Sequence, residues 1–86
     1  MTSKQIKLNC PLGLTVEPAG ILCKEAVNYK CSINIEYDGG VANAKSMLNL
    51  LGAALRNGDE LRIVCDGEDE TLAINNISEI LSERFV

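Results

Sequence analysis

The dipeptide Asp38-Gly39, inside the segment CSINIEYDGGVAN, constrains this chain more than any other feature. Asp-Gly is typical of the tight turn that joins two antiparallel strands. Before the turn, alternate residues are apolar or aromatic, which places Cys31, Ile33, Ile35 and Tyr37 on one side. The sequence therefore predicts a strand over 31–37, a short strand over 40–43 and one buried face on this hairpin.

Two further segments alternate with the same period of two. The first, KQIKLNC, predicts a strand over 4–9, with Ile6, Leu8 and Cys10 on one side. The second, DELRIVCDG, predicts a strand whose inward side chains are Leu61, Ile63 and Cys65. Together with the hairpin, these segments give four strands.

Three segments between and after the strands have helical spacing. Pro18 suits the first turn of the first helix, whose buried face is expected to hold Ala19, Leu22, Cys23 and Ala26. Ser46 is a good N-cap for the second, and Gly58 follows its expected last turn. Gly52 weakens the middle of that helix by about 1 kcal/mol relative to alanine.

The third helix is expected over the segment EDETLAINNISEILSERFV. Acidic residues crowd its first turn, which suits the positive end of the helix dipole. Its predicted apolar stripe consists of Leu72, Ala73, Asn76, Ile77, Ile80 and Leu81.

The resulting order of elements is β-α-β-β-α-β-α, with no linker or repeat to divide residues 1–86. We expect a single α+β domain. Its simplest architecture is a two-layer open-faced sandwich, in which a four-stranded, mostly antiparallel sheet carries three helices on one face.

The composition excludes several classes of partner. Eight basic residues face twelve acidic ones, a net charge of −4, so no basic surface is expected for nucleic acid. Tyr29, Tyr37 and Phe85 are too few and too scattered for a base-stacking platform. No apolar run approaches the ~20 residues that span a bilayer, and the N-terminus lacks the apolar core of a signal peptide. We therefore expect a cytoplasmic protein that contacts no membrane.

The chain contains four cysteines and no histidine. Cys10, Cys23, Cys31 and Cys65 lack the spacing of a metal site and are interpreted as small buried apolar residues, although their redox state stays open. The lack of histidine removes the commonest general base and the commonest metal ligand. We expect no metal, no cofactor and no enzymatic activity.

Several segments carry a resemblance to a known family: PLGLTVEPAGIL, INIEYDGG, NAKSMLNLLGAAL and ELRIVCDGEDE. With the order of elements, they make the whole chain similar to HPr, the histidine-containing phosphocarrier protein of the sugar phosphotransferase system. The resemblance implies the HPr fold. It also implies that functional residues are to be sought at the positions of two HPr motifs.

The active motif of the HPr family is a turn of the form G-[LI]-H-A-R-P-[AS]. The matching positions here are Gly13, Leu14, Pro18 and Ala19. Thr15 stands where the resemblance puts the phosphorylated histidine, Val16 where it puts alanine, and Glu17 where it puts the active-site arginine.

These replacements are incompatible with phosphate relay. A phosphoramidate has a high transfer potential, whereas phosphothreonine is an alkyl ester with little driving force to pass its phosphoryl on. Arginine forms a hydrogen-bonding fork for phosphate, but Glu17 repels it. At about 6 Å and an effective dielectric near 20, one pair of unit charges is worth about 3 kcal/mol before screening, against about 1 kcal/mol from helix N–H groups. We expect phosphate occupancy to fall by more than about tenfold.

Two interpretations of Thr15 and Glu17 stay open. In the first, they only begin a helix, because a hydroxyl can cap and a carboxylate complements the positive helix end. In the second, the acidic turn selects a different protein partner. No catalytic residue is assigned to either position.

The second HPr motif is N-x-K-S, matched by Asn43, Ala44, Lys45 and Ser46. The resemblance implies that Ser46 is a regulatory phosphorylation site, because a dedicated kinase modifies this serine in Gram-positive members. Ser46 is also an ordinary N-cap, and both roles are compatible since a helix N-terminus suits phosphate. Lys45 is expected to neutralise part of the added charge.

The helix after Ser46 carries more apolar residues than a core contact needs, since Leu50 and Ala54 would suffice. The resemblance places Met47, Leu48 and Leu51 in an exposed docking patch around the active site. The alternative is that they are core residues, Met47 most readily.

Three hypotheses of function follow. The first is a regulatory or docking protein that binds an HPr-type kinase, a transcriptional regulator or a phosphotransferase enzyme. The resemblance suggests this because the catabolite-repression paralogue of HPr also lacks the active histidine. The second is a phosphocarrier with an unconventional acceptor. The third is an HPr-fold binding module unrelated to sugar transport. The oligomeric state stays open.

Overall fold

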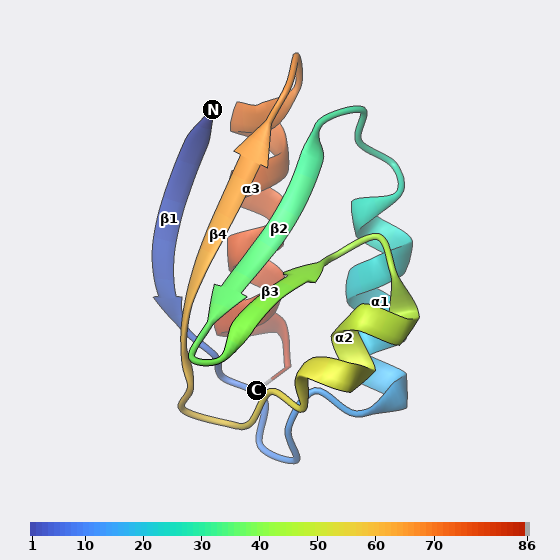
Figure 1. Cartoon of the computed structure of the whole chain (residues 1–86), viewed down its shortest axis with the longest axis vertical. Helices are drawn as coiled ribbons and strands as arrows, with labels where there is room; N and C mark the ends of the chain where they lie inside the picture. Colours follow the sequence, from blue (N-terminus) through green and yellow to red (C-terminus); the bar gives the residue numbers. More distant parts are fainter. Residues whose placement is uncertain (86) are drawn as a thin grey trace.

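The computed structural model describes residues 1–85. Along the chain the elements are β1 (Thr2–Lys7), α1 (Val16–Ala26), β2 (Ser32–Tyr37), β3 (Gly40–Asn43), α2 (Met47–Ala53), β4 (Glu60–Asp66), α3 (Glu70–Glu79) and a π-helical turn, η1 (Ile80–Arg84). The predicted order of elements is confirmed (Figure 1). Val86, the last residue of the predicted third helix, lies outside the described residues.

The four strands form one sheet in the order β1-β4-β2-β3, and every neighbouring pair is antiparallel. Tyr37 pairs with Gly40 at the hairpin, as the Asp38-Gly39 turn predicts. In Figure 1 α3 lies behind the sheet, α1 and α2 lie to its right, and the front face of the sheet is uncovered. The predicted α+β open-faced sandwich is therefore confirmed.

The core lies between the sheet and the helices. Alternate residues of the two central strands are fully buried as predicted: Ile33, Ile35, Leu61, Ile63 and Cys65. Their neighbours Ser32, Glu36 and Arg62 point to the uncovered face and are exposed. From α1, Ala19, Leu22 and Ala26 are buried as predicted, but Cys23 is only half-buried.

The first strand is shifted from its predicted range of 4–9. It ends at Lys7 because the next residues bond to other segments: Leu8 N–H donates to the Asp59 carbonyl at 2.8 Å and Asn9 N–H to the Leu81 carbonyl at 2.9 Å. Leu8 and Cys10 remain buried, although they lie beyond the strand.

The second helix is shorter than predicted. It stops at Ala53 rather than just before Gly58, because Ala54 adopts a left-handed conformation with φ 51°. The expected core residue Ala54 is consequently exposed. Leu55, the next residue, is buried in its place, and its carbonyl accepts the Leu14 N–H at 2.9 Å.

The predicted apolar stripe of the third helix is only partly confirmed. Leu72, predicted to face the core, is exposed, while Ile74 and Ser78 are buried. The remaining apolar members, Ala73, Ile77, Ile80 and Leu81, are buried as predicted. The buried positions 73, 74, 77, 78, 80 and 81 recur at the three- and four-residue spacing of one helical face, and Leu72 lies just outside that face.

Candidate functional site

The turn that enters α1 holds Thr15 and Glu17, the residues that the sequence analysis singled out. Thr15 is the N-cap residue of α1 by position; its N–H donates to the Gly13 carbonyl at 2.9 Å and its carbonyl accepts the Ala19 N–H at 2.9 Å. The Thr15 hydroxyl makes no capping hydrogen bond, so that expectation is wrong. The cause is Pro18 at the third helical position, because proline lacks the N–H that such a hydroxyl would accept.

A hollow of about 310 Å³ opens beside this turn. It is lined by Cys10, Pro11, Leu12, Gly13, Thr15, Glu17, Pro18, Ile21 and Phe85, of which none is basic. Glu17 is exposed in the first turn of α1, where its carboxylate complements the positive end of the helix. The hollow thus combines apolar walls with one negative charge.

The smaller hollow contains no histidine, lysine or thiolate that would activate the Thr15 hydroxyl. Its thiol, Cys10 Sγ, donates a hydrogen bond to the Gly13 carbonyl at 3.0 Å. Burial raises the pKa of the Cys10 thiol, so it stays protonated near neutral pH. The remaining ionisable side chain in this lining is Glu17.

A second hollow, of about 420 Å³, adjoins the first, and the two share Leu12, Gly13 and Thr15. Its other lining residues are Leu14, Val16, Leu51, Ala54, Leu55 and Arg56. The Gly13–Thr15 turn is therefore a ridge between two hollows, of which one is lined by the acidic Glu17 and the other by the basic Arg56.

Ser46 is the N-cap of α2, as predicted: its Oγ accepts the Asn49 N–H at 3.2 Å. The side chain is half-buried. The Lys45 ammonium is hydrogen-bonded elsewhere. The Lys45 ammonium donates to the Tyr29 carbonyl at 2.6 Å, so it ties the loop before β2 to the loop before α2. The role of Lys45 in neutralising a phosphate on Ser46 stays a prediction.

The predicted docking residues differ in exposure. Met47 is half-buried and packs against the core, whereas Leu48 is 82% exposed and Leu51 is 39% exposed. The sequence analysis gave no role to Leu12, which is 89% exposed, or to Arg56. It also did not predict that the apolar side chain of Val16 is exposed. Leu12 carries a local signal, because an apolar side chain in a Pro-Leu-Gly turn has no regular element to bury it.

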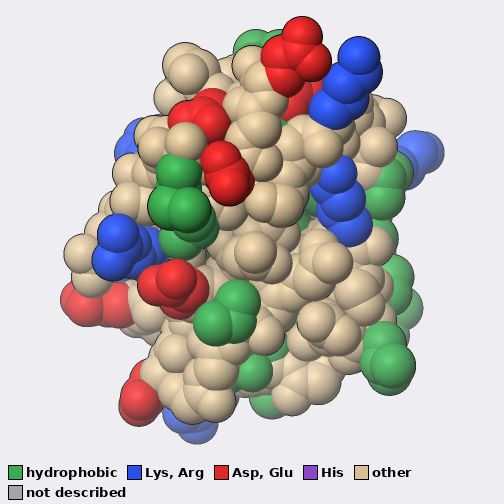
Figure 2. Space-filling model, turned by 45° about the horizontal axis from the view of Figure 1, so that its top comes forward, with side chains coloured by type: hydrophobic (Ala, Val, Ile, Leu, Met, Phe, Trp, Pro, Cys, Tyr) green, Lys and Arg blue, Asp and Glu red, His purple; other side chains and the backbone are tan. Residues whose placement is uncertain are grey.

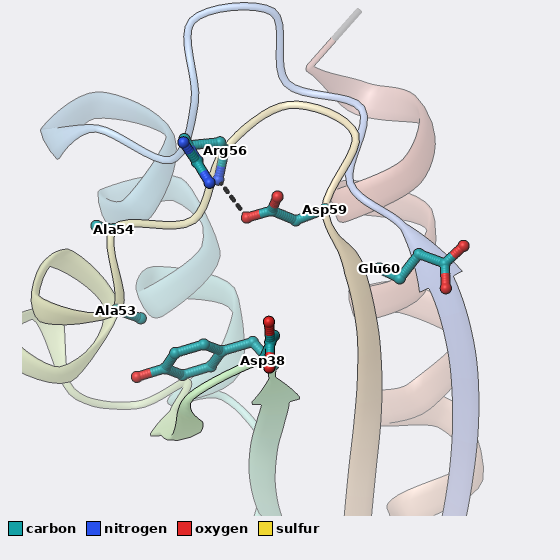
Figure 3. Close-up of a pocket in the computed structure, with 7 residues that line it drawn as sticks. Asp38, Ala53, Ala54, Arg56, Asp59 and Glu60 are labelled. Carbon is teal, nitrogen blue, oxygen red and sulfur yellow. Dashed lines mark hydrogen bonds between the residues drawn. The ribbon is translucent and has the colours of Figure 1, made fainter.

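A third hollow, of about 460 Å³, lies beyond Arg56, between the end of α2, the β2–β3 hairpin and the start of β4 (Figure 3). It is lined by Tyr37, Asp38, Ala53, Ala54, Arg56, Asp59 and Glu60. The Arg56 N–H donates to Asp59 Oδ2 at 2.8 Å, which fixes the main chain at Arg56. Within residues 1–85, no three His, Cys, Asp or Glu side chains are arranged to hold a metal ion.

All four cysteines are free thiols. Cys10, Cys31 and Cys65 are buried as predicted, and only Cys23 is half-buried. Burial, followed by the neighbouring Cys31, raises the pKa of Cys65 to about 12. These thiols behave as apolar core side chains.

Charged side chains are interspersed on the face shown in Figure 2, where lysine and arginine lie in separate places with acidic residues between them. Each helix of residues 1–85 is too short or too polar to cross a bilayer.

Comparison with known proteins finds relatives that all carry the name HPr or HPr-like. The family model described as "PTS HPr component phosphorylation site" matches residues 2–83. The chain is 36% identical to the phosphocarrier protein HPr of Buchnera aphidicola subsp. Acyrthosiphon pisum, over 96% of this chain and 98% of that protein. It is 34% identical to the HPr-like protein Crh of Halalkalibacterium halodurans, over 98% of this chain and 100% of that protein.

Solved structures agree with these relatives. HPr-C-His from Thermoanaerobacter tengcongensis matches with a TM-score of 0.92 at 25% identity, over 99% of this chain and 96% of that one. Crh from Bacillus subtilis, described as an intertwined dimer with a swapping domain, matches with a TM-score of 0.76 at 28% identity, over 94% and 93%.

Proposed function

The chain belongs to the HPr family, and on that premise we propose that it is a regulatory or docking protein that does not relay phosphate through a histidine. The observation that carries the proposal is that the chain contains no histidine. The resemblance to HPr puts Thr15 at the position of the phosphorylated residue. Similarity to Crh from Bacillus subtilis, which is described as a catabolite repression protein, supports a regulatory role. We propose that it acts in the cytoplasm.

The surroundings of Thr15 support the loss of phosphate relay. On one side of Thr15 the hollow presents Glu17, which would repel a phosphate; the nearby basic side chain, Arg56, lines the other hollow and does not belong to the turn that enters α1. That hollow contains no histidine or lysine to take the hydroxyl proton, and its carboxylate, Glu17, is exposed to solvent. Threonine phosphate, once formed, would be a stable ester and the end of a relay.

The remaining candidate for modification is the Ser46 hydroxyl. It accepts a single long hydrogen bond at 3.2 Å from the Asn49 N–H and is half-buried at the surface. Phosphorylation would add about 1.5 to 2 negative charges next to the exposed Leu48. We propose that this charge changes which proteins dock on Leu48 and Leu51, whether a transcriptional regulator or a phosphotransferase enzyme.

Treatment of the folded protein with an HPr-type kinase and ATP, followed by peptide mass spectrometry, tests the regulatory part. We expect one phosphate, located on Ser46, in the wild type and in Thr15→Ala. Ser46→Ala is expected to remain unmodified while retaining its fold by circular dichroism. An unmodified wild type, or phosphate on Thr15, would contradict this part of the proposal.

A further inference from the structure

We propose that Asn49 is a positioning residue for Ser46, because it closes a ring of hydrogen bonds that holds the Ser46 hydroxyl in place for phosphoryl transfer. The ring joins Asn43, Ser46 and Asn49, and we call it the Asn49 ring. The inference rests on the proposed modification of Ser46. It adds to that site a residue that lies outside the N-x-K-S motif.

The ring begins at a free edge of the sheet, since β3 is the last strand in the order β1-β4-β2-β3. Just after β3, the Ala44 N–H donates to the Ile33 carbonyl at 2.9 Å. Hydrogen-bonded and non-hydrogen-bonded pairs alternate in an antiparallel ladder, so the neighbouring pair, Asn34 with Asn43, is non-hydrogen-bonded. The Asn43 N–H therefore points away from β2, and the sheet offers it no acceptor.

Asn49 supplies that acceptor from the first turn of α2. Its Oδ1 accepts the Asn43 N–H at 3.3 Å, and its own N–H donates to Ser46 Oγ at 3.2 Å. The Asn43 carbonyl accepts the Ser46 N–H at 3.0 Å, which closes the ring. Asn49 thus binds the edge of the sheet through its side chain and the hydroxyl of Ser46 through its main chain.

Two further contacts fix the chain between β3 and α2. Asn43 Oδ1 accepts the Lys45 N–H at 2.9 Å, and the Lys45 ammonium donates to the Tyr29 carbonyl at 2.6 Å. These contacts hold the main chain before Ser46. The Asn49 side chain adds the link between the sheet edge and α2, which carries the donor to Ser46 Oγ.

The ring leaves the Ser46 hydroxyl able to react. In phosphoryl transfer, the Ser46 oxygen forms a bond to the γ-phosphorus of ATP, the bond from that phosphorus to ADP breaks, and the hydroxyl proton passes to a base of the kinase. Ser46 Oγ uses one lone pair for the Asn49 N–H and retains its O–H and its second lone pair. A hydroxyl that is already held in place loses less freedom in the transition state, so the ring is expected to raise kcat.

Steady-state kinetics with an HPr-type kinase and ATP, together with amide hydrogen exchange of the unmodified protein, test the proposal. Asn49→Ala removes the side-chain acceptor and keeps the main-chain N–H that bonds to Ser46. We expect kcat for Ser46 to fall by about three- to tenfold while KM changes by less than about twofold. The Asn43 amide should exchange at least about threefold faster in this variant.

Two further variants make the test specific. Asn49→Asp keeps an oxygen that accepts the Asn43 N–H, so the Asn43 amide should exchange as slowly as in the wild type. Asn75→Ala makes the same truncation at an exposed position of α3 and should leave kcat, KM and the Asn43 exchange rate unchanged. Circular dichroism verifies that each variant is folded at the assay temperature, so a loss of stability alone would not lower kcat.

Three results would overturn this inference alone: an unchanged kcat in Asn49→Ala, an equal exchange rate of the Asn43 amide in Asn49→Ala and the wild type, or a loss confined to KM. The last result would assign Asn49 to contact with the kinase. A wild type that the kinase leaves unmodified would overturn the proposed modification of Ser46 and this inference with it.

Discussion

At the scale of single residues, Asp69 has a role that sequence patterning missed. Its carboxylate accepts the Lys30 N–H and the Cys31 N–H, both at 2.9 Å, and so joins the loop before β2 to the start of α3. These two backbone donors lower the pKa of Asp69 below its ordinary value of 3.8. From the sequence, Asp69 looked like one more acid in a helical first turn.

We expect Asp69→Asn to be less stable than the wild type at neutral pH, because an amide accepts these bonds more weakly than a carboxylate. Since folding lowers the pKa of Asp69, its contribution is fully present above pH 3.8 and is lost as the pH falls through the lowered value. Urea unfolding between pH 7 and acid should therefore show the two proteins converging below pH 3.8. The exposed neighbour Glu68 provides the control: Glu68→Gln should follow the wild type, and a gap that widened in acid would contradict this account.

Residue identity also explains why capping was predicted correctly at Ser46 and wrongly at Thr15. Both precede a helix and both are hydroxyl residues. The third residue after Ser46 is Asn49, which supplies an N–H, whereas the third after Thr15 is Pro18, which has none. Whether the third residue carries an N–H, and not the capping residue alone, determines whether the bond forms.

At the scale of elements, α2 differs most from its prediction. An apolar pattern that continued to Leu55 suggested a helix ending near Gly58. The helix ends earlier because Leu55 must reach the core while its carbonyl accepts the Leu14 N–H from the ridge. That contact joins segments far apart in the sequence, so local periodicity does not contain it.

The left-handed turn at Ala54 predicts opposite effects of glycine at neighbouring positions. Ala54→Gly should stabilise the protein by roughly 0.5–1 kcal/mol, because glycine adopts φ 51° without steric cost. Ala53→Gly, one residue earlier and within α2, should destabilise it by about 1 kcal/mol. Urea unfolding of both variants measures the difference, and equal signs would show that the helix does not end where the structure places it.

At the scale of the whole molecule, the fold class was predictable because its signals are local. The alternation around Ile33, Ile35 and Ile63 and the Asp38-Gly39 turn determine buried faces and one hairpin. The strand order β1-β4-β2-β3 was not predicted, since it depends on how α1 and α3 pack across the sheet.

The candidate site was predictable only in part. Its sequence positions, Thr15, Glu17 and Ser46, came from resemblance to HPr. The approach of Arg56 and Leu51 to Thr15 arises from the tertiary contact between Leu14 and Leu55. A sequence pattern contains no direct record of such a contact, so the two hollows beside Thr15 emerged only from the structure.

The central claim is that this member of the HPr family does not relay phosphate. It is tested most directly with labelled phosphoenolpyruvate, the first enzyme of the phosphotransferase system and a downstream acceptor enzyme. We expect no label to pass through the wild type. Thr15→His/Glu17→Arg should become labelled and pass the label on, and Thr15→His alone should do so at least about tenfold less, because Glu17 repels phosphate. Transfer of label through the wild type to the acceptor would contradict the account.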